Sequence, residues 1–226
     1  MRIEVEAGSP ESVEADVLAA PLSASGGLTG PAAALNGSLG GLVARLVEQG
    51  EITGELKTAP LVHVDNDRPK AARLALAGLG EREAVDADAL RTAAATVARE
   101  ARAFASSIAW LLDESLPLSP AEQARAIVDG TLLGSYDPGR WKSSFEAPRL
   151  QQLTLVSGDA TVRVAARRAG IVAEWTNRAR DLANAPPNEL TPKALADRAA
   201  VRASASSVRR RAARLWCSRT PSPPPG

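Results

Sequence analysis

Short apolar runs alternate with longer amphipathic segments along most of the chain. Ile3 and Val5 alternate with charged residues, which predicts a short opening strand. Further apolar runs of strand length predict strands at residues 16–22, 60–64, 73–79, 107–112 and 150–156. Because these runs alternate with helical patterns, the sequence predicts an α/β layered domain.

The segments between the predicted strands carry helix signals. A glycine-rich turn at residues 26–30 leads into an Ala-rich helix, and further helices are predicted at 39–48, 86–105, 120–136 and 161–182. Asp86 and Asp88 favour the start of the third helix. Ser119-Pro120-Ala121-Glu122 is a capping box with proline at the first helical position. Residues 137–149 form a polar loop with two prolines.

The pattern changes after the long helix at residues 161–182. Pro186 and Pro187 force an extended linker, and Thr191 with Pro192 then predicts the N-cap and first residue of a new helix. From residue 201 the chain is rich in Arg, Ser, Ala and Pro without apolar periodicity, which predicts a disordered tail.

Composition narrows the classes of function. The chain has 226 residues, of which 45% are hydrophobic, enough for a sizeable core. One Cys and one His exclude an internal disulfide framework, a Cys-rich zinc site and a multi-His metal site. The acidic N-terminus lacks the apolar run of a signal peptide, and no run approaches the roughly 18 residues of a membrane span. We therefore expect a soluble, cytoplasmic protein.

The near-neutral net charge of +1 is the sum of two unlike segments. The part up to Ala200 carries a net charge of −5, which argues against nucleic-acid binding. The tail holds Cys217 and no acidic residue. Its arginines could bind nucleic acid without sequence specificity, but we interpret the tail as an unselected sequence. They are Arg202, Arg209, Arg210, Arg211, Arg214 and Arg219.

Three features could carry chemistry, and each has an ordinary structural interpretation that we favour. The turn at Gly26–Gly30 could offer N–H groups to a phosphate, but it matches neither dinucleotide nor Walker signatures. His63 could be a base or a metal ligand, yet its alternation with valines is typical of a strand residue facing a polar side. Two D-x-D spacings could bind Mg²⁺ or Mn²⁺, but they lie in a turn and at a helix start. They comprise Asp65, Asp67, Asp86 and Asp88. The residues alone thus predict a non-catalytic domain with no catalytic, cofactor-binding or metal-binding residue.

The run NRARDLANAPPNELTPKALA at residues 177–196 closely resembles the interdomain junction of the leucyl aminopeptidases, also called cytosol aminopeptidases. Upstream segments agree with that family. DVLAAP at residues 16–21 resembles its first buried strand, LAGLG at 76–80 the end of another strand, and ARAIVDGTLLGSY at 124–136 a helix. The resemblance covers roughly residues 1–200.

The resemblance implies a macro-like α/β domain at residues 1–160, with a mixed sheet flanked by helices. It also implies an interdomain helix and Pro-rich linker at 161–192 and the start of a catalytic domain at 193–200. Members of the family hydrolyse N-terminal residues from peptides with two divalent metals, Mn²⁺ or Zn²⁺, and form homo-hexamers. Their metal-binding NTDAEGRL run is absent here. We therefore expect the chain alone to be inactive, and we interpret residues 201–226 as a truncated or frameshifted end.

A second hypothesis follows from the macro-like resemblance. Macro domains bind ADP-ribose with a strand followed by a glycine-rich loop, and residues 16–30 are similar to that arrangement. A stand-alone nucleotide-binding module is therefore the alternative function. The polar Asn residues usual in such loops are replaced by Ala20-Pro21-Leu22.

Overall fold

The computed structural model of the protein describes residues 1–64, 70–141 and 149–205. The chain divides into two compact units, Met1–Arg180 and Asp181–Gly226, which are considered separately.

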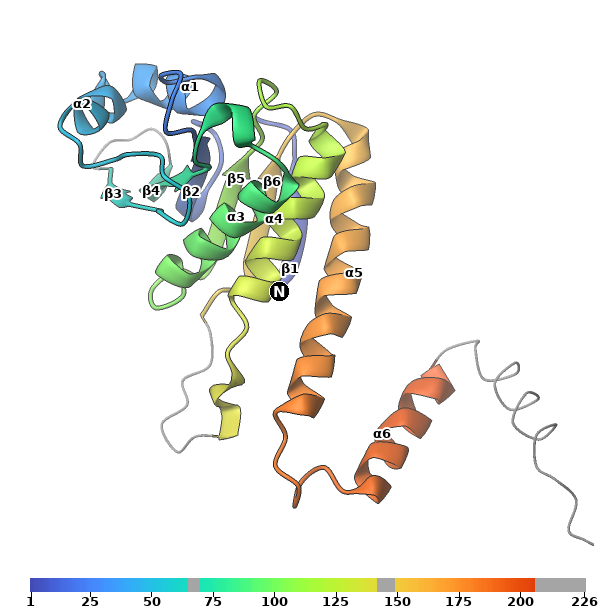
Figure 1. The fold of residues 1–226 in the computed structure, drawn as a ribbon. Coiled ribbons are helices and arrows are strands. Elements are labelled where there is room, and N and C mark those ends of the chain that lie inside the picture. Colours follow the sequence, from blue (N-terminus) through green and yellow to red (C-terminus); the bar gives the residue numbers. More distant parts are fainter. Residues whose placement is uncertain (65–69, 142–148, 206–226) are drawn as a thin grey trace, which may run out of the picture. The chain divides into compact units, whose positions relative to one another are not determined.

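The first unit is built on one six-stranded sheet, with the strand order β1-β6-β5-β2-β4-β3 (Figure 1). Neighbouring strands are parallel except β3, which runs antiparallel to β4. This confirms the predicted mixed sheet and each predicted strand. The strands are β1 Arg2–Glu6, β2 Ala15–Leu22, β3 Leu61–His63, β4 Ala71–Gly78, β5 Ser107–Leu111 and β6 Gln152–Val156.

Helices connect the strands as the sequence pattern predicts. Their bounds are α1 Gly30–Ser38, α2 Leu42–Glu48, α3 Ala87–Ala101, α4 Pro120–Gly134 and α5 Ala160–Ala183, with short 3₁₀ turns η1 Arg82–Ala84 and η2 Pro138–Trp141. The predicted helix at 39–48 begins only at Leu42, because Gly40 and Gly41 adopt left-handed backbone conformations with φ of 59° and 82°. The helix predicted at 86–105 ends at Ala101.

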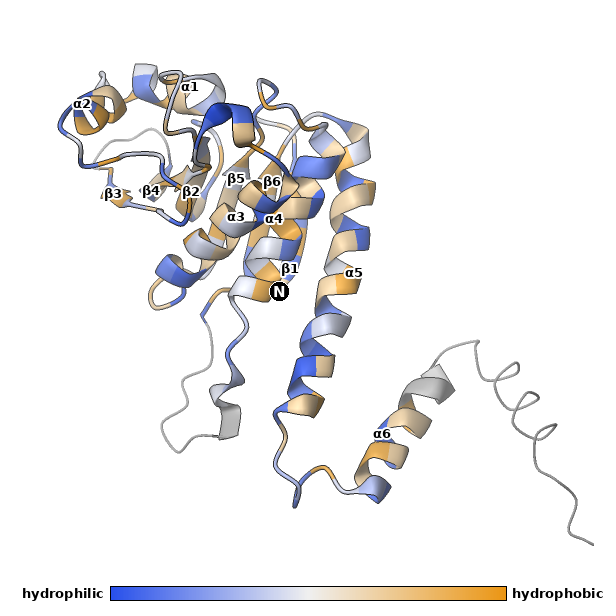
Figure 2. Ribbon diagram, in the orientation of Figure 1, coloured by the Kyte–Doolittle hydropathy of each residue, from blue (hydrophilic) through white to orange (hydrophobic). Residues whose placement is uncertain are grey.

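Both faces of the sheet are covered, and this explains why its strands are apolar rather than alternating. On β2, Val17 and Ala19 pack into one core cluster with residues of α3, α4 and α5. Leu18 and Ala20 point the other way, into a second cluster that includes residues of α1 and α2. Figure 2 shows hydrophilic residues interspersed along α5, and many residues of this helix are exposed.

Two predicted helix starts are confirmed by side-chain caps. Asp86 accepts a hydrogen bond from the Ala89 N–H at 2.8 Å. Ser119 accepts from the Glu122 N–H at 3.3 Å, and the Glu122 carboxylate accepts from the Ser119 N–H at 2.9 Å, which completes the capping box. Each cap satisfies amide groups that a helix start otherwise leaves unbonded.

The second unit contains helix α6, Pro192–Ala205. Thr191 accepts a hydrogen bond from the Ala194 N–H at 3.2 Å, as its predicted capping role requires. The helix extends past residue 200, where the apolar pattern ends, because the Ala and Arg residues that follow are strong helix formers. The remaining tail residues, 206–226, lie outside the described residues.

None of the helices in the described part of the chain combines the length and apolar character needed to cross a membrane.

Candidate functional sites

The glycine-rich turn lies at the carboxyl end of β2 and leads directly into α1. Gly26, Gly27 and Gly30 have φ of 87°, 73° and 51°, a region that favours glycine. A Cβ atom on Gly30 would overlap the carboxylate of Asp113, from the loop after β5. The turn therefore serves as the tight strand-to-helix connection that the sequence favoured, and Gly30 lets Asp113 approach the start of α1.

Asp113 is held in place by its own loop and by α4. Its side chain is buried, and its Oδ1 atom accepts hydrogen bonds from the Ser115 N–H at 2.8 Å and the Ser115 hydroxyl at 2.7 Å. The amide of the buried Gln123 side chain donates to the Asp113 carbonyl at 2.8 Å and accepts from the Asp113 N–H at 3.0 Å. Neither Asp113 nor Gln123 belongs to a recognisable sequence motif, so their contact could not be predicted from local sequence.

A crevice of about 400 Å³ opens between this turn and the carboxyl ends of β5 and β6. Its wall includes Gly30 and the carboxyl-bearing residues Asp113 and Glu114. Asp113 carries negative charge to the N-terminal end of α1, where a bound phosphate would otherwise be favoured. Two carboxylates in the wall would repel such an anion, so the geometry argues against the nucleotide-binding alternative.

Arg82, from the loop after β4, is engaged by hydroxyl groups of the loops after β2 and β5. Its guanidinium donates to the Thr29 hydroxyl at 2.8 Å and to the Ser115 hydroxyl at 3.3 Å. Its backbone N–H donates to the Ser25 hydroxyl at 3.3 Å. The residue thereby ties together the loops after β2, β4 and β5.

His63 takes the strand position that the sequence predicted. It lies on the short edge strand β3, is exposed, and accepts a hydrogen bond on Nε2 from Arg73 Nε at 3.3 Å. The Arg73 guanidinium also stacks on the Phe104 ring, 4.1 Å from its centroid. This arrangement is a surface contact between β3, β4 and the end of α3.

Asp86 and Asp88, the described pair of the two D-x-D spacings, each have a structural role on α3. Asp86 caps α3, and Asp88 forms an ion pair with Arg91 on the same helix. Asp65 and Asp67 lie outside the described residues, as do the tail arginines from 209 onward. Within residues 1–64, 70–141 and 149–205, no group of three or more His, Cys, Asp or Glu residues could hold a metal ion.

Side-chain hydrogen bonds of Asp16, Ser106 and Ser107, which the sequence did not predict, join β2 to β5 at their amino ends. Asp16 Oδ2 accepts from the Ser106 N–H at 2.6 Å, the Ser106 hydroxyl at 2.7 Å and the Ser107 N–H at 3.1 Å. The Ser107 hydroxyl accepts from the Asp16 N–H at 2.9 Å. These bonds, led by that of the Ser106 hydroxyl, lower the pKa of Asp16 despite its partial desolvation. The sequence did offer one signal for these bonds: an aspartate stands at the start of one buried strand, and two serines stand at the start of another.

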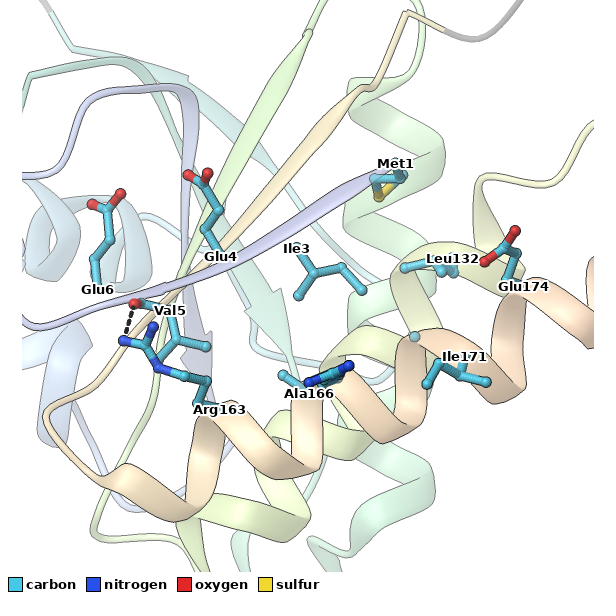
Figure 3. A pocket seen from close by; sticks show the side chains of 12 residues that line it. Met1, Ile3, Glu4, Val5, Glu6, Leu132, Arg163, Ala166, Ile171 and Glu174 are labelled. Carbon is cyan, nitrogen blue, oxygen red and sulfur yellow. Dashed lines mark hydrogen bonds between the residues drawn. The ribbon is translucent and has the colours of Figure 1, made fainter. Parts of the chain in front are cut away.

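A groove of about 750 Å³ runs between β1 and α5 (Figure 3). Ile3 and Val5 point toward α5, whereas Glu4 and Glu6 point to the other face of the sheet. A guanidinium nitrogen of Arg163, on α5, donates to the Val5 carbonyl at 3.2 Å across the groove. The groove is apolar on its floor and charged at its rim.

The fold defines an α/β domain with a mixed six-stranded sheet that is covered on both faces. The chain belongs to the cytosol aminopeptidase family: the model of that family's N-terminal domain matches residues 20–144. It is 36% identical over 206 residues to a probable cytosol aminopeptidase from Roseiflexus castenholzii, covering 88% of this chain and 40% of that protein. Over 122 residues it is 41% identical to a probable cytosol aminopeptidase from Streptomyces avermitilis, covering 50% of this chain and 23% of that protein.

Solved structures share the fold. A mutant of tomato leucine aminopeptidase matches with a TM-score of 0.76 at 23% identity, over 90% of this chain and 42% of that one. The bottromycin maturation enzyme BotP in complex with Mn matches with a TM-score of 0.66 at 26% identity, over 84% of this chain and 36% of that one. The chain thus spans less than half the length of these relatives, in the part that includes their N-terminal domain.

Proposed function

We propose that this chain is the N-terminal, non-catalytic portion of a metal-dependent leucyl aminopeptidase. The observation that carries the proposal is the match of residues 20–144 to the family's N-terminal domain. The chain covers 40% of the Roseiflexus relative, which leaves most of that protein without a counterpart here. On this proposal the 226-residue chain does not hydrolyse peptides by itself, and the full-length protein removes N-terminal residues from them.

The described residues of this chain do not fit the two divalent metals that the family's chemistry requires. Asp86 is used as a helix cap and Asp88 as an ion-pair partner, and the described residues offer no cluster of ligands. Mn²⁺ or Zn²⁺ would therefore be bound by the remainder of a full-length protein. A structure of BotP in complex with Mn, which shares the fold, supports metal use in the family. No step of peptide hydrolysis is assigned to residues of this chain.

The outer side of α5 supports a role as part of a larger protein. Four large apolar side chains on it are more than half exposed: Val164, Ile171, Val172 and Trp175. Exposed apolar patches of this kind mark contact surfaces. We propose that this side of α5 packs against the rest of a full-length aminopeptidase.

The assembly and location follow the relatives on the same proposal. A full-length protein would form homo-hexamers, act on peptides in the cytoplasm and leave nucleic acid unbound. The net charge of −5 on residues 1–200 supports the last point, because phosphate backbones are bound through excess positive charge.

A peptidase assay tests the proposal. The purified 226-residue chain is incubated with leucine p-nitroanilide and Mn²⁺, and then with Zn²⁺, with the full-length Roseiflexus relative as the positive control. We expect release of p-nitroaniline by the control and none above background by the chain. Metal-dependent turnover by the chain would overturn the proposal.

A further inference from the structure

Strand β1 is an edge strand of the sheet and, within the described residues, pairs with β6 alone. The Arg2 N–H and the Glu6 carbonyl bond to the β6 side, at 2.7 and 2.9 Å. Backbone groups alternate in direction along a strand, so those of Ile3 and Val5 point to the open side. The Val5 carbonyl accepts one hydrogen bond there from α5, and a carbonyl oxygen has a second lone pair. The edge is therefore able to accept another strand.

The two faces of β1 differ in character. Ile3 and Val5 face α5 and border the groove of Figure 3. Arg2, Glu4 and Glu6 lie on the opposite face, where the Arg2 guanidinium pairs with the Glu4 carboxylate at 3.1 Å. An incoming strand would thus meet an apolar groove on one face and a row of charges on the other.

We propose that the free edge of β1 pairs antiparallel with β1 of a second copy of this chain, about a two-fold axis at Glu4. Ile3 then lies opposite Val5 of the partner subunit, and each of the two such pairs exchanges both backbone hydrogen bonds. Paired residues share a face, so the partner subunit's Ile3 and Val5 turn toward the groove side. A continuous sheet across the two subunits results.

Charge complementarity selects a second copy over other occupants. Read in opposite directions, the strand RIEVE places Arg2 opposite Glu6 of the partner subunit, and the two-fold axis repeats this pair. Opposite charges across neighbouring strands stabilise the pairing. The exception is Glu4, which meets its own copy, and two like charges directly opposite each other oppose the pairing. Because the contact is short, we expect a weak dimer of the kind formed by small interfaces.

Sedimentation velocity at increasing concentration of the full 226-residue chain tests this pairing. We expect the mass to rise from the monomer value of 23.5 kDa toward twice that value. Arg2→Glu or Glu6→Arg alone puts like charges opposite each other and weakens association roughly tenfold. The double variant Arg2→Glu with Glu6→Arg restores the opposite charges and returns association to near the original strength. Glu4→Gln removes the like-charge contact and tightens association about two- to fivefold.

The controls separate pairing from folding. Arg2 and Glu6 are exposed, so each variant should keep the thermal unfolding midpoint of the original chain. A chain that stays monomeric across the concentration range would overturn the proposal. So would association that none of the three single substitutions changes, because it would use another surface. The pairing needs no peptidase activity, so it and the proposed function can fail separately.

Discussion

Asp16 and Asp113 stand at opposite ends of the same sheet, and each fixes a loop through its carboxylate. Asp16 accepts three hydrogen bonds from Ser106 and Ser107 at the amino ends of the strands. Asp113 accepts two from Ser115 at the carboxyl ends and reaches the start of α1 beside Gly30. Hydrogen bonds to charged acceptors contribute more to stability than those between neutral groups. Both carboxylates are thus structural groups, and their removal has measurable effects.

Replacing Asp16 by Asn should lower the free energy of unfolding at neutral pH by about 1 to 2 kcal/mol, because the neutral amide is a weaker acceptor. The folded state lowers the pKa of Asp16 below its ordinary value of 3.8. The stabilisation is therefore present above that value and is lost as the pH falls through the lower folded pKa. Urea unfolding of both proteins between about pH 7 and pH 3 measures the difference.

The matched control for this substitution is Glu14→Gln. Glu14 pairs with Lys70 at 3.0 Å, and both side chains are exposed. Exposed ion pairs contribute little, so this change should alter the unfolding free energy by less than about 1 kcal/mol. A difference between the Asp16→Asn variant and the original chain that grows on acidification would contradict the assigned role of Asp16.

Gly30 and Gly27 offer a comparison of two substitutions in one turn. Both have positive φ, so alanine at either position costs about 1 to 2 kcal/mol in backbone conformation. At Gly27 a Cβ atom meets nothing within 4 Å, whereas at Gly30 it collides with the Asp113 carboxylate. Gly30→Ala should therefore destabilise clearly more than Gly27→Ala in thermal unfolding. Equal effects would show that Asp113 does not closely approach the turn.

At the scale of elements, the two helices α3 and α4 pack closely because α4 carries glycines on the side that meets α3. A Cβ atom on Gly130 would overlap the Arg91 carbonyl, and one on Gly134 would lie 2.6 Å from the Ala95 Cα. These contacts are with backbone or Cβ atoms, which cannot move aside as a flexible side chain can. Glycine in a helix interior usually lowers stability, and here close packing accounts for it.

Gly130→Ala should therefore destabilise the protein, although alanine favours a helix by about 1 kcal/mol over glycine. Gly37 in α1 is the matched control, since a Cβ atom there meets nothing within 4 Å. Gly37→Ala should raise the free energy of unfolding by up to about 1 kcal/mol. Chemical denaturation of the two variants checks the opposite signs. A stabilising Gly130→Ala would contradict the close approach of α3 and α4.

At the scale of the whole molecule, the sequence pattern predicted the strands and the helices between them, and the family resemblance implied the mixed sheet. It succeeded because both sheet faces are buried, so the strands are short continuous apolar runs such as β2. It did not predict the hydrogen bonds of Asp16 with Ser106 and Ser107, or those of Gln123 with the backbone of Asp113. Those contacts join residues of separate loops and strands through single side chains, and no local spacing reports them. The open edge of β1 likewise depends on the strand order.

The candidate sites likewise divide into features that local sequence predicts and features that depend on contacts between distant segments. The predicted turn at Gly26–Gly30, the strand position of His63 and the helix-start position of Asp86 are confirmed, because such features depend on neighbours in sequence. The crevice beside Asp113 and Glu114 depends on which loops meet at the carboxyl ends of the strands. The position of these two carboxylates beside the glycine-rich turn argues against phosphate binding. That position could not be predicted from either loop alone.

We propose that this chain provides no catalytic metal site, and titration with Mn²⁺ tests this claim most directly. The electron paramagnetic resonance signal of free Mn²⁺ disappears when the ion is bound, and BotP, whose structure contains Mn, provides the control. We predict that the signal with the 226-residue chain follows that of buffer alone. Saturable loss of the signal at a fixed number of ions per chain would contradict the claim.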